Sequence, residues 1–293
     1  MKNMTLIERL RGSLIAGTIG DCIGNRYEGA EPGDIIEWDF NWQISDDTQM
    51  TLATCEAIYD KKIIKPEEVA NSFLNWYNKG RITGVGSATL KALRELQVGG
   101  HWALVGRSGE FAAGNGAAMR IAPLAFKNVS ENFIIKDICN ITHKNDEAYI
   151  GALAVYYAIK YAIGGKWCGY SDLIEKIIPL LPDTLIRDKL LKFQKFKNEP
   201  LQYLKTVPRP TGYVVDSVPV ALFAAQKIHE SSLEEIILNL TALGGDTDTV
   251  CSICSQIIGA LKGTNGIPEH WIEKYKRLYA SVIIENLVCN WKF

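Results

Sequence analysis

The chain has 293 residues, of which 47% are hydrophobic and 22% charged, the composition of a globular protein with a substantial core. This composition excludes a disordered chain. The 32 basic and 33 acidic residues give a formal net charge of -1, and Lys and Arg are scattered along the sequence. Such a chain has no broad basic field for a phosphate backbone, so we expect no direct nucleic-acid binding. We expect one domain over residues 1–293.

The cysteines and the apolar runs indicate a cytoplasmic protein. Seven cysteines, an odd number widely spread among apolar neighbours, suit reduced and buried thiols. Cys251 and Cys254 form a C-x-x-C pair, but no second pair or nearby His completes a zinc site. The N-terminal apolar stretch is interrupted by Glu8 and Asp21, and no run reaches the ~20 residues that span a bilayer. We therefore expect neither a signal peptide nor a membrane contact.

Apolar residues recur at helical spacing along most of the chain, whereas convincing alternating strands are scarce. The pattern predicts an all-α fold of many helices around a central core. Residues 178–212 are richer in Lys and Pro and are predicted to be peripheral. The predicted helices start at Leu6 and then cover 45–60, 69–77, 85–98, 116–128, 150–161, 214–229, 232–241, 247–262 and 271–289.

Small residues occur at every fourth position of the first helix, at Gly12, Ala16, Gly20 and Gly24. A glycine in a helix interior costs up to ~1 kcal/mol relative to alanine, so this density needs a packing reason. The segment 251–260 is similarly rich in small residues. We therefore predict that these two helices lie side by side at the centre of the molecule.

Two acidic clusters, Ser45 to Thr48 and Asp246 to Thr249, each precede a predicted helix. For one cluster alone, helix capping and hard-metal binding are both open, because Asp and Ser are favoured N-caps. If the two small-residue helices pack together, both clusters can face one pocket. So many buried carboxylates would repel one another without cations. Oxygen-only ligation selects magnesium or manganese over zinc or copper.

Six segments, in order and at matching spacing from about residue 8 to 265, resemble the successive motifs of the ADP-ribosylglycohydrolase family. That family includes the dinitrogenase reductase-activating glycohydrolase and the ADP-ribosyl-acceptor hydrolases. Each motif alone is weak, but six in order are a specific signal. The segments are 17–24, 45–48, 114–120, 142–143, 212–216 and 244–249.

The resemblance implies an all-α, multi-helix orthogonal bundle with a central cleft that holds two Mg²⁺ ions, with Mn²⁺ as an alternative. Glu28 matches a glutamate that closes over the metals in some members, although such a residue is more often an ordinary surface carboxylate. The implied catalytic residues are Glu28, Asp47 and Asp248. The implied metal ligands are Ser45, Asp46, Asp47, Asp246, Asp248 and Thr249.

The resemblance also implies the residues that bind ADP-ribose. His143 follows the Thr-His motif, whereas His101, His229 and His270 are read as structural. The alternative role for Arg120 is that of a structural ion-pair partner. Asp216 is predicted to be structural. The implied ligand-binding residues are Gly86, Asn115, Gly116, Met119, Arg120, His143 and Tyr213.

The implied reaction is hydrolysis of the N- or O-glycosidic bond between ADP-ribose and a modified protein side chain, with arginine slightly favoured. Magnesium would orient the ribose and polarise a water, and a carboxylate would accept the proton. Some arginine-directed relatives carry an aspartate where this chain has Gly84, so the acceptor is not fixed. Serine-linked ADP-ribose, small ADP-ribose conjugates and a catalytically silent ADP-ribose-binding relative are the alternatives. We expect a monomer whose partner is the ADP-ribosylated protein or conjugate.

Overall fold

The structure is a computed structural model that describes residues 4–33, 37, 40–127, 129 and 131–293. The prediction of an all-α fold is confirmed, since the strands in the described part of the chain are two segments of two residues each. The longer helices are α1 (Leu6–Asn25), α2 (Asp46–Ile58), α3 (Pro66–Asn78), α4 (Ser87–Gln97), α7 (Asn132–Asn140), α8 (Asp146–Ile163), α10 (Leu185–Lys195), α11 (Val214–Ala225), α12 (Leu233–Thr241), α13 (Thr247–Lys262) and α15 (Tyr279–Cys289).

Shorter elements connect these helices. The two strands pair in parallel, with Arg107 opposite His143. The short elements are α5 (Trp102–Val105), α6 (Ala122–Ala125), α9 (Leu173–Ile177), α14 (Glu269–Tyr275), the strands β1 (Arg107–Ser108) and β2 (His143–Lys144), and the 3₁₀ turns η1 (Glu110–Ala112), η2 (Asn115–Ala117), η3 (Ile178–Leu180), η4 (Leu201–Thr206) and η5 (Gly263–Gly266).

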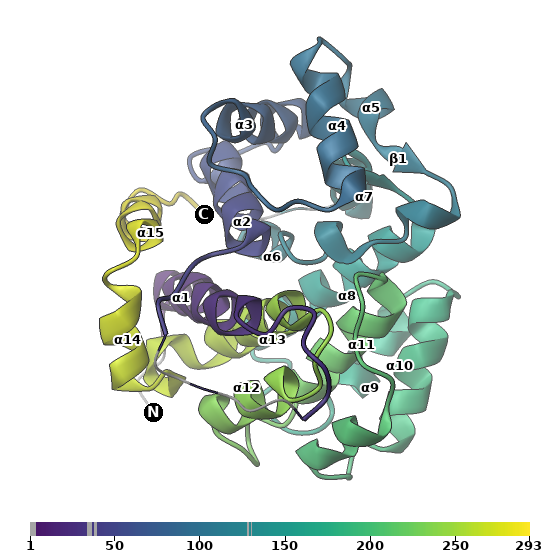
Figure 1. Ribbon diagram of the computed structural model, residues 1–293, viewed down its shortest axis with the longest axis vertical. Helices are drawn as coiled ribbons and strands as arrows, with labels where there is room; N and C mark the ends of the chain where they lie inside the picture. The colour runs from purple at the N-terminus through teal and green to yellow at the C-terminus, as the bar shows by residue number, and fades with distance from the viewer. Residues whose placement is uncertain (1–3, 34–36, 38–39, 128, 130) are drawn as a thin grey trace.

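Helices α1 and α13 run side by side through the middle of the molecule, with α2 to α4 on one side and α12 on the other (Figure 1). The small-residue rows explain this contact. A Cβ atom on Gly20 would lie 2.4 Å from the carbonyl oxygen of Cys251, and one on Gly24 would lie 2.3 Å from that of Thr247. The predicted pairing of the two helices is confirmed. Their antiparallel arrangement brings the end of α1 to the start of α13.

Two predicted helices are interrupted. The predicted helix 116–128 is replaced, in its described part, by η2 and the short α6, and Pro123, which has no N–H to donate to the preceding turn, lies in the first turn of α6. The predicted helix 271–289 is two helices, with Leu278 in an extended conformation between them. The hydroxyl group of Ser281 donates to the carbonyl groups of Lys276 and Leu278, which satisfies backbone groups at this break.

The segment 178–212 contains a helix that apolar spacing did not single out. Ile186, Leu190 and Phe193 are buried on one face of α10, which contacts α11. The segment lies at the edge of the molecule in Figure 1, as predicted. Helices α5, α7 and α9 were also not predicted.

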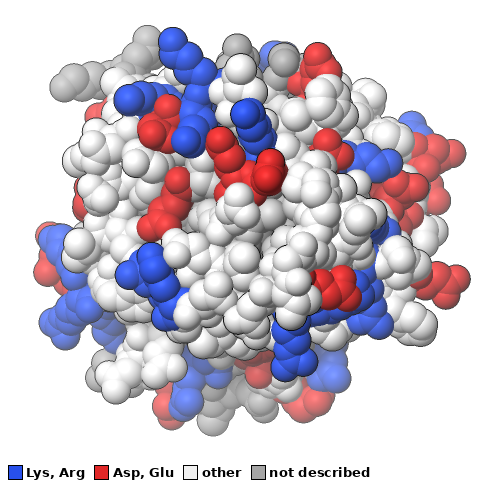
Figure 2. Space-filling view, turned by 90° about the horizontal axis from the view of Figure 1, so that it is seen from above, with Lys and Arg blue, Asp and Glu red and all other residues white. Residues whose placement is uncertain are grey.

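Surface charge is mixed. Figure 2 shows Lys and Arg interspersed with Asp and Glu over the described part of one face, without a broad basic patch there. Within the described residues, no helix combines the length and the apolar character needed to cross a bilayer.

The contact between α1 and α13 gives a test of the fold. Gly20→Ala places a methyl group against a backbone carbonyl that cannot move aside, so we expect a loss of about 1–3 kcal/mol in the free energy of unfolding. Gly212→Ala is the matched control, because a Cβ atom there meets no atom within 4 Å. Urea unfolding monitored by circular dichroism measures both. Equal stability of the two variants would contradict the close contact.

Candidate functional site

The start of α2 is fixed to α1 by one buried carboxylate. Asp21, on α1, is 0% exposed and accepts hydrogen bonds from the backbone N–H groups of Ser45 (3.1 Å) and Thr48 (3.2 Å). These N–H groups belong to the N-terminal turn of α2, where helix geometry leaves donors without partners. Burial raises the pKa of Asp21 to about 6. The contact positions the first acidic cluster beside the end of α1.

The second acidic cluster follows a glycine turn held between two other segments. Gly244 and Gly245 have φ values of +66° and +77°, which L side chains rarely adopt. A Cβ atom on Gly244 would lie 2.2 Å from the carbonyl oxygen of Ala30, and one on Gly245 would lie 2.1 Å from that of Pro210. The turn therefore fixes the direction in which α13 begins.

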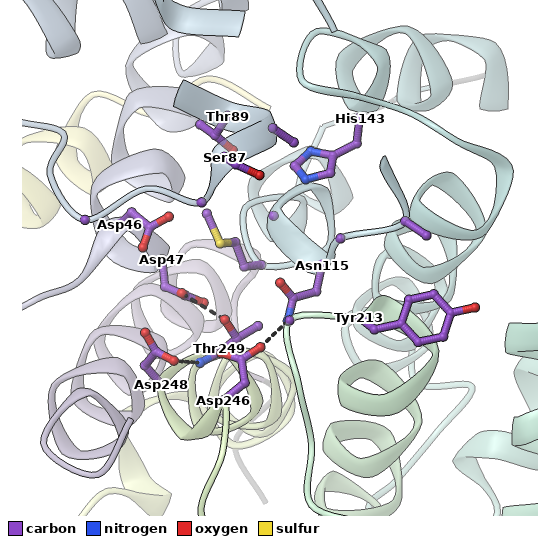
Figure 3. Close-up of a pocket in the computed structure, with 18 of the residues that line it drawn as sticks. Asp46, Asp47, Ser87, Thr89, Asn115, His143, Tyr213, Asp246, Asp248 and Thr249 are labelled. Carbon is purple, nitrogen blue, oxygen red and sulfur yellow. Dashed lines mark hydrogen bonds between the residues drawn. The ribbon is translucent and has the colours of Figure 1, made fainter. Parts of the chain in front are cut away.

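The two clusters meet, as the sequence predicts (Figure 3). Carboxylate oxygens of Asp46, Asp47 and Asp248 all lie within 4.8 Å of one another. The hydroxyl group of Thr249 donates to Asp47 Oδ2 at 3.1 Å, which joins α13 to α2 directly. Asp246 lines the same cleft, and its Oδ2 accepts from Asn115 Nδ2 at 2.5 Å.

Electrostatics in the cluster favour a bound cation. Burial, and then the charge of Asp21, raise the pKa of Asp46 to about 7. Burial, and then the charge of Asp246, raise the pKa of Asp248 to about 10. Burial and the charge of Asp248 also raise the pKa of Asp47, whose Oδ1 is buried without a hydrogen-bond partner among the described residues. A hard divalent cation fits this set of oxygen donors, because it relieves the repulsion and satisfies the free oxygen.

The acidic cluster forms one end of a cleft of about 450 Å³. Its floor includes a glycine loop that is bonded to the start of α11: the N–H of Asn115 donates to the carbonyl of Gly212 at 3.0 Å, and that of Val214 to the carbonyl of Ala113 at 3.0 Å. The N-terminus of α4, which has no side-chain cap, forms another wall. His143 points into the cleft, and Tyr213, 38% exposed, lies at its rim (Figure 3).

Most of the residues predicted from the sequence come together in this cleft. Ser45 and Arg120 do not line it. Ser45 is the N-cap of α2, and its hydroxyl accepts from the N–H of Asp47 at 3.1 Å. Arg120 is 0% exposed and lies behind the glycine loop, so the expected ligand contact is replaced by a supporting position. The predicted residues that line the cleft are Glu28, Asp46, Asp47, Gly86, Asn115, Gly116, Met119, His143, Tyr213, Asp246, Asp248 and Thr249.

Sequence reasoning missed two features of the site. It gave Asp21 no role there, although a carboxylate within a row of small helical residues is itself an unusual signal. Phe111 is 82% exposed and lines the cleft, but it stands in a stretch without helical periodicity. Ser87 and Thr89 on α4 line the cleft beside the predicted Gly86. An isolated exposed aromatic residue is common, so only the structure separates Phe111 from other surface residues.

Comparison with known families agrees with this geometry. The sequence model described as ADP-ribosylglycohydrolase matches residues 2–290. The chain belongs to the ADP-ribosylglycohydrolase family. It is thus a hydrolase, and the family supports a metal-dependent ADP-ribosyl hydrolase activity.

Individual relatives are distant but similar over most of their length. The chain is 26% identical to the ADP-ribosylarginine hydrolase Tri1 of Pseudomonas putida, over 92% of this chain and 74% of the relative. It is 27% identical to the ADP-ribosylhydrolase ARH3 of Danio rerio, over 91% of this chain and 86% of the relative. A solved structure titled "ADP-ribosylglycohydrolase-related protein complex" superposes with a TM-score of 0.73 at 23% identity, covering 97% of each chain. That similarity supports the fold of this ADP-ribosylglycohydrolase.

Metal binding to the carboxylate cluster should depend on pH. In the metal-free chain the pKa of Asp46 is raised from 3.8 to about 7, so the folded state binds a proton that the unfolded state releases. The stability of the metal-free protein therefore falls as pH rises from about 4 to 7. We expect Mg²⁺ to stabilise the fold more at pH 8 than at pH 5, where protons compete for the carboxylates.

Thermal unfolding with Mg²⁺ or with EDTA at both pH values measures this effect. At a free Mg²⁺ concentration 100 times Kd the gain at pH 8 is about 2.7 kcal/mol. Asp248→Asn should stabilise the metal-free chain and reduce the gain from Mg²⁺. An equal stability gain from Mg²⁺ at pH 5 and pH 8 would contradict metal binding by the cluster. An equal gain in Asp248→Asn and the wild type would contradict it as well.

Proposed function

We propose that this ADP-ribosylglycohydrolase releases ADP-ribose from a modified protein side chain by Mg²⁺-dependent hydrolysis of the glycosidic bond, and so reverses mono-ADP-ribosylation. The observation that carries the proposal is the convergence of three carboxylates, two of them buried and one half-buried, at one end of a cleft lined with hydrogen-bond donors. A cation at that end and donors along the cleft match a ligand with ribose hydroxyls at one end and a diphosphate beyond it.

The cleft offers a site for each part of ADP-ribose. Its volume of about 450 Å³ lies within the usual range of ligand pockets. The diphosphate lies at the start of α4 and the glycine loop, because a helix N-terminus presents free N–H groups and a positive dipole end. The exposed ring of Phe111 and the rim residue Tyr213 offer faces for the adenine base. The ribose to be released lies over the acidic cluster.

Asp46, Asp47, Asp246, Asp248 and Thr249 are the residues that would hold two Mg²⁺ ions, with Mn²⁺ as an alternative, and Ser45 orients Asp47. Bound magnesium supplies Lewis acidity to the ribose hydroxyls and to the attacking water. The Asn115 amide holds the carboxylate of Asp246, and the Thr249 hydroxyl holds that of Asp47.

Three carboxylates are candidates for the proton acceptor in the attack by water. Asp47 and Asp248 lie in the acidic cluster itself. Glu28 stands at the exposed edge of the cleft, where partial desolvation and the charge of Asp246 raise its pKa. A raised pKa brings a carboxylate closer to the working pH of a general base.

Arginine is the acceptor that the surroundings favour. A second hollow of about 300 Å³ shares Glu28, Gly212 and Asp246 with the main cleft. It continues past the acidic cluster, where the modified side chain would leave. Glu28 and Asp246 attract a guanidinium leaving group more strongly than a neutral hydroxyl group. The charge of Arg209, which also lines this hollow, is offset by an ion pair with Glu31 at 2.8 Å.

Asp248→Asn tests the catalytic role of the cluster. The substitution keeps the shape of the side chain and removes one negative ligand, so we expect release of ADP-ribose to fall by more than ~100-fold, beyond the effect of losing an outer-shell partner. Asp183→Asn is the control, because its side chain is 86% exposed and does not line the cleft. Chromatographic measurement of free ADP-ribose reports both rates. Release of ADP-ribose by Asp248→Asn at the wild-type rate would refute the proposed site.

Parallel assays with arginine-linked and serine-linked ADP-ribosyl peptides in Mg²⁺ identify the acceptor. We expect faster release from the arginine-linked peptide. Faster release from the serine-linked peptide would overturn the acceptor preference but retain the activity. Binding of ADP-ribose without release from either peptide would overturn the hydrolysis of protein-linked ADP-ribose and direct attention to small conjugates.

A further inference from the structure

Arg120 is a cation sealed beneath the floor of the cleft. Its guanidinium group donates to the carbonyl groups of Gly116 and Ile138 and, at 2.8 Å, to the hydroxyl oxygen of Thr142. It also lies 5.1 Å from the centre of the Phe73 ring. A buried cation needs fixed partners. Arg120 therefore links the glycine loop to the segment that carries His143.

The hydroxyl group of Thr142 has one proton to donate, and its two hydrogen-bond neighbours restrict where that proton can go. Its oxygen accepts from Arg120 and lies 2.7 Å from Nδ1 of His143. Thr142 is 0% exposed, and in the described part of the chain no other acceptor bonds to its hydroxyl. If Nδ1 carried a proton, the hydroxyl proton would be buried without an acceptor, which costs about 1–3 kcal/mol. The arrangement that satisfies both the hydroxyl group and Nδ1 has the hydroxyl donating to Nδ1.

The other ring nitrogen of His143 faces the ligand side. A Cβ atom on Gly114 would lie 2.9 Å from Nε2, and one on Gly116 would lie 2.9 Å from Cε1, so only glycines let the ring lie against this loop. Nε2 bonds to none of the described residues, and His143 lines the cleft. Burial, and then the charges of Arg120 and Arg107, lower the pKa of His143 to about 3, so the ring is neutral.

We propose that Arg120 and Thr142 are positioning residues that hold His143 as the neutral tautomer with Nε2 protonated, so that the cleft presents a fixed hydrogen-bond donor to a ligand oxygen. The opposite tautomer would present a lone pair, which repels a phosphate oxygen because that oxygen can only accept. Because the ring stays neutral, this donor does not change with pH between 5 and 8. The identity of the ligand oxygen rests on the proposed function, whereas the tautomer does not.

Nitrogen NMR of protein labelled with ¹⁵N-histidine tests the tautomer directly. We expect Nδ1 of His143 in the range of an unprotonated ring nitrogen and Nε2 in the range of a protonated one, unchanged from pH 5.5 to 8. Loss of the signal in His143→Gln assigns it among the four histidines. A proton on Nδ1, or a doubly protonated ring at pH 7, would overturn the proposal whether or not the protein hydrolyses any substrate.

Substitution at Thr142 tests whether its hydroxyl group fixes the tautomer of His143. Thr142→Val keeps the shape and removes the hydroxyl, so we expect a mixture of tautomers and about 3- to 10-fold weaker binding of ADP-ribose by calorimetry. Thr142→Ser should restore both the spectrum and the affinity. Thr241→Val, which removes a buried hydroxyl on α12, is the control and should change neither.

The outcomes are distinguishable. An unchanged tautomer in Thr142→Val would overturn the positioning role of Thr142. So would a Thr142→Ser variant that does not show the wild-type tautomer. If Thr142→Val does not fold, the wild-type spectrum and Thr142→Ser still decide the tautomer. Absence of ADP-ribose binding by the wild type would contradict the proposed function and leave the spectral result standing.

Discussion

The close contact between α1 and α13 is the constraint on which the site depends. Helix backbones approach this closely only where side chains are absent, and glycines provide that space along α1. The antiparallel pairing places the end of α1 at the start of α13, and Asp21 then holds the start of α2 against α1. Two helix N-termini from distant parts of the sequence thus meet at one point. A bulkier contact between the central helices would move one acidic cluster relative to the other.

Concentrated negative charge is the second constraint. Asp46, Asp47 and Asp248 are held together by backbone geometry rather than by attraction for one another, and their raised pKa values express the resulting repulsion. The rest of the fold supplies the stability that maintains this arrangement. Functional sites often carry such local unfavourable energy. The donors of the cleft, on α4 and the glycine loop, complement this negative charge.

The sequence predicted the helices whose apolar faces are regular and the residues whose position follows from local rules. Asp46 and Asp248 are such residues, since each lies at a helix N-terminus. The position of Arg120 was not predictable, because its direction depends on Phe73 and Ile138, which are distant in sequence. The break at Leu278 was missed because apolar spacing continues through it. The extent of a single domain over 1–293 and the identity and number of the metal ions stay predictions.

The bond between Thr249 and Asp47 joins residues 202 positions apart. A chain that is still being synthesised therefore carries Asp46 and Asp47 through most of translation without their partners. The acidic end of the cleft comes into existence only after α13 has left the ribosome and packed against α1. A chain that lacks α13 has no complete acidic cluster with which to bind a ligand. The ability to bind therefore arises late in synthesis, in a single step.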